Sequence, residues 1–176
     1  MRLLFWTGFW VFLADQASKY IVVHYLDLIT KMRIDVFPPF LTFQMAWNRG
    51  VNFGIGAGFD MRWVLVGIAF AISAGVLFWL WRKPADRFTY ISAGFLIGGA
   101  MGNVVDRFIY GAVADFLNMS CCGISNPFVF NLADVFIFAG ALGLILFTDE
   151  AQTKPAANGK KKPRKAAPKG YHYMPD

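Results

Sequence analysis

The sequence predicts an all-α membrane protein in which four transmembrane helices carry a small outward-facing β-hairpin between the first and second spans. Of the 176 residues, 57% are hydrophobic and only 16% are charged, which is typical of a membrane protein rather than a soluble domain. Four apolar stretches approach the roughly 20 residues needed to cross a bilayer, at residues 3–25, 63–81, 88–110 and 128–147. We therefore expect one membrane domain over residues 1–150.

The first apolar stretch is expected to be a retained span and not a cleaved secretory signal. It is rich in aromatic residues, lacks a small-x-small cleavage site, and is interrupted by Asp15 and Lys19. These two residues lie four positions apart on one helical face, with the acid first, which is the better order for an ion pair. We interpret them as a structural pair that holds helices together.

The positions of lysine and arginine predict the orientation. The link at residues 82–87 and the tail at residues 151–176 hold ten of the 17 basic residues, so both termini and this link are expected in the cytoplasm. Residues 26–62 and 111–127 then face outward. The tail has almost nothing to bury, which indicates a disordered segment that touches anionic membrane lipids rather than nucleic acid.

The outer β-segment is expected at about residues 36–56. Large apolar side chains alternate with small or polar ones over residues 41–47 and again over residues 51–55, with a turn near residues 48–50. Such a hairpin could hold an extended peptide by strand pairing or could simply cap the bundle. The pattern leaves these two possibilities open.

The second outer segment contains the adjacent residues Cys121 and Cys122. No C-x-x-C pattern accompanies them, and His24 and His172 lie far away in the sequence, so no metal site is predicted. Adjacent cysteines seldom bridge without strain, and we expect an unbridged pair in a short loop.

Polar residues gather at the outer ends of the third and fourth spans. Gly94, Gly98 and Gly102 recur every four residues and would let another helix approach closely. Asn103, Asp106 and Arg107 continue this helix and need partners, because buried polar groups must be hydrogen-bonded.

Asp115 lies at the outer boundary, and Asp134 lies about six residues into the fourth span, so the two carboxylates are expected to meet just below the outer surface. Two carboxylates in a dry site share one proton, and the ionised member can then activate water. Membrane carboxylates also form proton relays and ion paths. From spacing alone, a hydrolase and a small proton- or cation-coupled transporter remain equal alternatives.

Five motifs in order resemble those of the bacterial lipoprotein signal peptidases, or signal peptidase II. They are DQASK (residues 15–19), NRGVNFG (48–54), GGAMGNVVDR (98–107), VADF (113–116) and FNLAD (130–134). The resemblance implies a four-helix aspartic endopeptidase of the inner membrane that cleaves prolipoproteins just before a diacylglyceryl-modified cysteine. We expect a monomer, and the chemistry of an aspartate pair is expected to need no metal or organic cofactor.

The same motifs imply roles for individual residues. Asp115 and Asp134 match the catalytic pair, while Asn48, Asn103, Arg107 and Asn131 match polar positions that bind substrate or orient the acids. Asp15, Lys19 and Asp106 are assigned structural roles. The alternative transporter would need a polar track across the whole bilayer, whereas the polar residues of this sequence gather on the outer side. A third alternative, a structural scaffold, predicts that Asp115→Asn and Asp134→Asn would be harmless.

Overall fold

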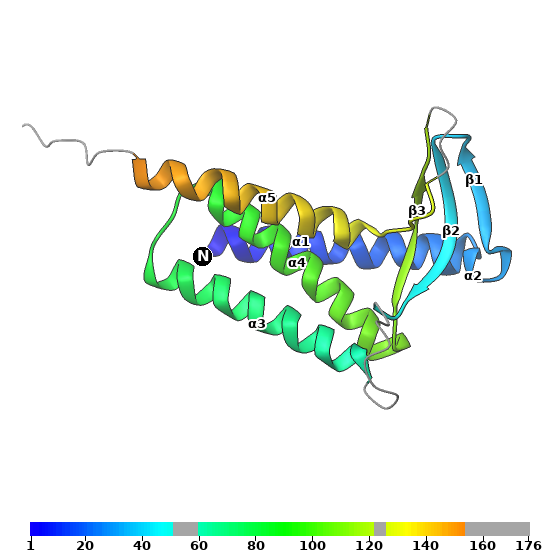
Figure 1. Cartoon of the computed structure of the whole chain (residues 1–176), viewed down its shortest axis with the longest axis horizontal. Helices are drawn as coiled ribbons and strands as arrows, with labels where there is room; N and C mark the ends of the chain where they lie inside the picture. Colours follow the sequence, from blue (N-terminus) through cyan, green and yellow to red (C-terminus); the bar gives the residue numbers. More distant parts are fainter. Residues whose placement is uncertain (51–59, 122–125, 154–176) are drawn as a thin grey trace, which may run out of the picture.

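The structure is a computed structural model that describes residues 1–50, 60–121 and 126–153. Long helices occupy all four predicted apolar stretches: α1 (Arg2–Lys19), which continues as the π-helix η1 (Tyr20–Tyr25), α3 (Met61–Arg82), α4 (Arg87–Tyr110) and α5 (Leu132–Thr153). They extend along the long axis of the molecule, and a β-sheet stands across one end of them (Figure 1).

The helix ends follow from local sequence. The side chain of Asp60 accepts a hydrogen bond from the backbone N–H of Arg62 at the start of α3, and Asp86 accepts one from Thr89 at the start of α4. Such N-caps satisfy backbone donors that have no partner within the helix. At the other end of α4, Gly111 adopts the left-handed conformation with φ of 75° that closes many helices.

Helix α4 is the centre of the bundle and packs against α1, α3 and α5. Its glycines allow the close approach that their spacing predicts. A Cβ atom on Gly98 would lie 2.5 Å from the carbonyl oxygen of Gly8, and one on Gly94 would lie 2.9 Å from that of Leu4. The glycine stripe is therefore confirmed as the packing surface between α4 and α1.

The outer β-structure differs from the predicted hairpin. The strand expected at residues 41–47 is confirmed as β2 (Leu41–Asn48), but its described partners are β1 (Arg33–Phe37) and β3 (Val113–Met119), in the antiparallel order β1-β2-β3. A short helix, α2 (Leu28–Lys31), precedes β1. The second strand predicted at residues 51–55 lies outside the described residues.

Strand β3 was expected to be only a connection. Its first four residues are all buried, because it lies between β2 and the helix ends and also pairs through Leu117 with Phe130. A strand covered on both faces has no polar and apolar alternation, so the usual sequence signal is lacking.

The start of α5 also differs from expectation. The helix begins at Leu132, so Asp134 lies in its first turn and not about six residues into the helix as predicted. Asn131 explains this start, because its Oδ1 accepts the backbone N–H of Asp134 at 3.0 Å while Asp134 Oδ2 accepts the N–H of Asn131 at 3.2 Å. This reciprocal pair has the form of a capping box.

The helices present apolar side chains outward, as a lipid-embedded bundle requires. Within the described residues, α3 and α4 have the length and hydropathy of membrane spans, and residues Leu132–Thr148 of α5 form a shorter apolar helix. Exposed large side chains include Phe5, Trp6 and Trp10 on α1 and Phe70, Phe78 and Trp81 on α3.

At Cys121, the expectation of an unbridged thiol is wrong, since this residue is in a disulfide.

Candidate active site

Asp115 lies on β3 and is 2% exposed. Two asparagines hold its carboxylate: Asn48, the last residue of β2, donates to Oδ2 at 3.0 Å, and Asn131 donates to Oδ1 at 2.5 Å. Pairing of β2 with β3 brings the first donor into place, and the turn before α5 brings the second. The carboxylate is therefore fixed from two elements that are distant in sequence.

Asp134 is fixed by the helix that carries it and by α4. Its Oδ2 accepts the backbone N–H of Asn131, and its Oδ1 accepts the side-chain amide of Asn103 at 2.8 Å. Asn131 thus contacts both acids, donating from its side chain to Asp115 and exchanging capping bonds with Asp134. The structure brings together the two acids that the sequence predicted would meet.

The pKa of Asp115 is raised from its ordinary value of 3.8 to about 6, and burial is the largest cause. The negative charge of Asp134 also raises this pKa, while hydrogen bonds from Asn131 and Asn48 and the charge of Lys19 act to lower it. Loss of solvation outweighs these favourable contacts because few water molecules reach the carboxylate. Asp115 therefore suits the role of the acid that keeps the shared proton.

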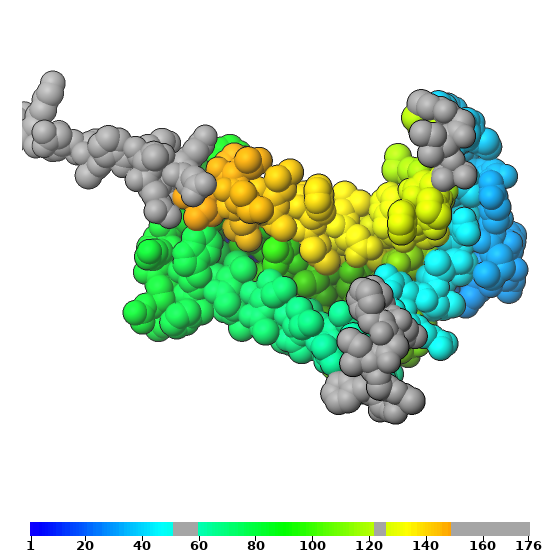
Figure 2. All heavy atoms as spheres, viewed as in Figure 1, coloured from blue at the N-terminus to red at the C-terminus, as the bar shows by residue number. Residues whose placement is uncertain are grey.

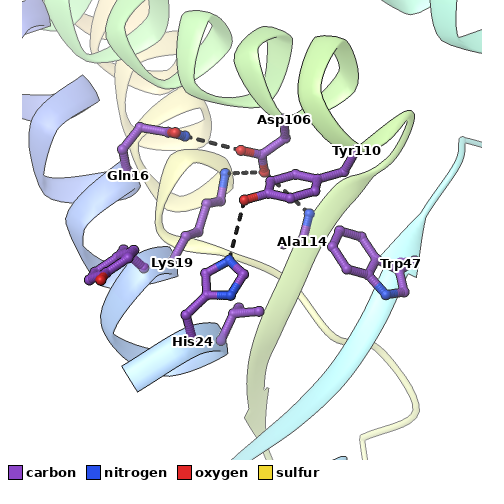
Figure 3. A pocket seen from close by; sticks show the side chains of 9 residues that line it. Gln16, Lys19, His24, Trp47, Asp106, Tyr110 and Ala114 are labelled. Carbon is purple, nitrogen blue, oxygen red and sulfur yellow. Dashed lines mark hydrogen bonds and ion pairs between the residues drawn. The ribbon is translucent and has the colours of Figure 1, made fainter. Parts of the chain in front are cut away.

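The predicted structural residues form a buried cluster beside the two acids. Lys19 Nζ lies 2.8 Å from Asp15 Oδ2 and 2.8 Å from Asp106 Oδ2, and it also donates to Asn103 Oδ1 at 3.2 Å. Figure 3 shows the ion pair with Asp106 and the hydrogen bonds of this carboxylate to Gln16 and to the backbone of Ala114. We call Asp15, Lys19 and Asp106 the ionic cluster.

An apolar cavity of about 350 Å³ opens on the other side of Asn103. Helices α3, α4 and α5 line it with Leu65, Ile68, Ala69, Ile72, Leu96, Ala100, Asn103, Arg107, Ile137 and Ala141. Figure 2 shows the corresponding hollow between α3 and α5, with α4 set back at its floor. Asn103 and Arg107 give this otherwise apolar cavity a polar end that leads to Asp134.

Arg107, at this polar end, has a buried N–H donor that is not satisfied by the described residues. It donates from Nη1 to the carbonyl of Asn103, whereas its buried Nε has no partner among the described residues. A buried N–H without a partner is costly in a folded protein unless a ligand satisfies it. The Nε–H of Arg107 can therefore donate to an acceptor group of a bound molecule.

Some contributors to the site were not predicted. Gln16 donates to both Asp15 and Asp106, and the backbone N–H groups of Ala114 and Ala133 bind the ionic cluster. Gln16 lies inside the motif DQASK, so its sequence position was a usable signal. Backbone donors carry no side-chain signature, and only the fold reveals them.

The chain is similar to known proteins over most of its length. The sequence model of the family described as signal peptidase (SPase) II matches residues 8–148. The chain is 38% identical to the lipoprotein signal peptidase of Methylorubrum extorquens over 81% of its own length and 82% of the relative's. With the enzyme of the same name from Sinorhizobium fredii it shares 40% identity, over 80% of the chain and 82% of the relative.

Solved structures show the same similarity. A bacterial membrane enzyme determined by the in meso method superposes with a TM-score of 0.67 at 27% identity, covering 89% of this chain and 94% of that one. A second in meso structure of a bacterial membrane enzyme gives 0.68 at 26% identity, over 83% and 92% of the two chains. Since the family model and relatives at 38 to 40% identity span most of the sequence, the chain belongs to the signal peptidase II family.

Proposed function

We propose that this protein is a membrane aspartic endopeptidase that removes the signal peptide from prolipoproteins. The cut would fall just before a diacylglyceryl-modified cysteine, and Asp115 and Asp134 would activate the attacking water. The observation that carries this proposal is the contact of Asn131 with both carboxylates, which holds them at one site beside an apolar cavity. An aspartate pair of this kind needs no metal or organic cofactor.

In the proposed mechanism Asp134 is ionised and Asp115 carries the proton. Asp134 takes a proton from water, whose oxygen attacks the scissile carbonyl carbon, while Asp115 gives its proton to the carbonyl oxygen. The resulting gem-diol collapses with cleavage of the C–N bond. The leaving amine of the modified cysteine receives the proton that Asp134 took. Asp115 regains its proton from one hydroxyl of the diol as the C=O bond reforms, which leaves a carboxylic acid at the end of the signal peptide.

The surroundings of the acids support this division of roles. Asp134 accepts two N–H donors in the first turn of α5, where the helix dipole favours a negative charge. Asp115 lies in a drier place on β3, where its raised pKa favours the protonated form.

The apolar cavity supports the proposed substrate. Its walls from α3, α4 and α5 suit a lipid chain or a hydrophobic signal helix, and its polar end suits a peptide backbone. The sheet stands at the same end of the bundle as the acids (Figure 1), and would hold the extended peptide around the cut. Arg107 and Asn103 would then bind carbonyl groups near the scissile bond.

The proposed topology has four spans, formed by α1, α3, α4 and α5 in the bacterial inner membrane. The N-terminus, the link between α3 and α4, and the C-terminal end of α5 all lie away from the sheet (Figure 1). With their basic residues they would face the cytoplasm, followed by the tail at residues 151–176. The site would then lie near the outer face, and the bundle of residues 1–150 would act as a monomer among membrane lipids.

Substrate selectivity tests the proposal. Purified protein in detergent should cleave a diacylglyceryl-modified prolipoprotein before the modified cysteine and leave the unmodified precursor intact. The product masses give the position of the cut. Cleavage of neither form, together with proton or cation flux in vesicles, would support the transporter instead.

The raised pKa of Asp115 predicts how the rate depends on pH. Because the proton on Asp115 is required, kcat/KM should fall as the pH rises through about 6, which is the pKa in the free enzyme. A bound peptide excludes more water and raises this pKa further, so the corresponding limb of kcat should lie at higher pH. Steady-state rates across pH 4 to 9 measure the fall of kcat/KM and the fall of kcat with rising pH. A kcat/KM that increases through pH 6 and stays high would contradict the assignment.

A further inference from the structure

The ionic cluster makes two backbone contacts that a simple helix-to-helix ion pair does not need. Asp15 Oδ1 accepts the N–H of Ala133 at 2.9 Å, and Asp106 Oδ2 accepts the N–H of Ala114 at 3.2 Å. Ala133 directly precedes Asp134, and Ala114 directly precedes Asp115. Each acid of the cluster therefore holds the backbone next to one of the two site carboxylates.

Lys19 joins these two contacts. Its ammonium group has three N–H donors, and they lie against Asp15, Asp106 and Asn103. The third contact orients the Asn103 amide, because an oxygen that faces Lys19 leaves the amide nitrogen to donate to Asp134. A continuous set of bonds therefore runs from one site carboxylate through the cluster to the backbone of the other.

The arrangement also excludes a ligand-binding role for the Lys19 cation. A cavity of about 120 Å³ lies beside it, lined by Tyr20, His24, Trp47 and Tyr110 among others (Figure 3). Since the three donors of Lys19 are engaged within the protein, none remains for a molecule in this cavity. The charge is directed inward, toward the acids.

We propose that the ionic cluster positions the catalytic pair, setting the separation and orientation of Asp115 relative to Asp134. This rests on the proposed function and assigns to Asp15, Lys19 and Asp106 a role beyond holding helices together. Asp15 and Asp106 are 0% and 1% exposed, so their bonds are not weakened by competing water. Any shift of the cluster is passed directly to β3 and to the start of α5.

The pH dependence of the cleavage rate distinguishes a cluster that positions the two carboxylates from one that only stabilises the fold. Three charged groups act on Asp115: the carboxylate of Asp134, the ammonium of Lys19 and the guanidinium of Arg107. Asp106 is joined to the same strand by the hydrogen bond that it accepts from Ala114, the residue before Asp115. If the cluster moves, the coupling of the two carboxylates changes, and so do the two apparent pKa values of the pair. A loss of folded protein would reduce the amplitude of the profile without moving it.

Two glycines of α4 provide a matched test. A Cβ atom on Gly102 would collide with Asp15 Oδ2 of the cluster, whereas a Cβ on Gly98, one turn away, would meet the backbone of Gly8. Both changes disturb the packing of α4 on α1, but Gly102→Ala places its new methyl group directly against a cluster side chain, whereas Gly98→Ala places it against Gly8 and Val11. Asp106→Asn is a second variant of nearly unchanged volume that loses one of the two acceptor oxygens.

Activity is measured on the diacylglyceryl-modified prolipoprotein, per folded molecule, from pH 4 to 9. We expect Gly102→Ala and Asp106→Asn to lower kcat by about 10- to 100-fold with little change in KM, and to move the limbs of the profile. Gly98→Ala should change kcat and the limbs of the profile less than Gly102→Ala does. Wild-type kcat and limbs in both cluster variants, with Asp134→Asn inactive, would overturn the positioning role; cleavage by Asp134→Asn would instead overturn the proposed function.

Discussion

Replacing either site carboxylate with its amide, Asp115→Asn or Asp134→Asn, is expected to reduce cleavage by at least about 10²- to 10⁴-fold. Asparagine keeps the size of the side chain but cannot take a proton from water or donate one of comparable acidity to the scissile carbonyl. Single-turnover rates on the diacylglyceryl-modified prolipoprotein measure the loss without interference from product release.

The control for this result is Asp35, which lies in the same sheet as Asp115. Asp35 on β1 forms an ion pair with Arg33, and the two side chains are 50% and 63% exposed. Asp35→Asn should therefore cleave at the wild-type rate. Thermal unfolding in detergent confirms that each variant is folded. Folded Asp115→Asn or Asp134→Asn protein that cleaves at the rate of Asp35→Asn would exclude that acid from the chemistry.

Asn131→Ala is expected to have the second largest effect, because this residue contacts both acids and caps α5. Loss of the cap should lower the free energy of unfolding by about 1 kcal/mol. Loss of the donor to Asp115 frees the carboxylate to rotate, and a displacement of this kind can lower the rate about 10²-fold. Rate and unfolding measurements on the same preparation separate the two effects.

Asp86→Ala is the matched control for Asn131→Ala. Asp86 caps α4 through the N–H of Thr89, at the end of the bundle far from the sheet. Its removal should cost a similar free energy of unfolding while the rate per folded molecule stays unchanged. If both variants lose stability and neither loses rate, Asn131 is a cap and nothing more.

The helices and the pairing of the acids could be predicted from the sequence, because both depend on local properties. Apolar length alone locates the helices, as the agreement of residues 63–81 with α3 and of residues 88–110 with α4 shows. Asp115 and Asp134 were expected to meet because a short connection joins two antiparallel helices. Their shared contact with Asn131 supports that placement.

The remaining features depend on contacts between distant segments. Strand β3 is buried on both faces and so lacks alternation, and β1 is recognisable only once β2 lies beside it. The start of α5 was placed too early because Phe128 and Phe130 extend the apolar run, although Phe130 pairs with β3 instead. The bonds of the ionic cluster to Ala114 and Ala133 join residues as far apart as 118 positions, which no local pattern reveals.

The central claim is that water activated by two carboxylates, and not a nucleophile of the protein, attacks the scissile carbonyl. The most direct measurement is a quenched single turnover in H₂¹⁸O, followed by intact mass analysis of the enzyme and the released signal peptide. The proposed mechanism predicts ¹⁸O in the new carboxylate of the peptide and an enzyme of unchanged mass at every time point. A transient enzyme species heavier by the mass of the signal peptide would contradict it.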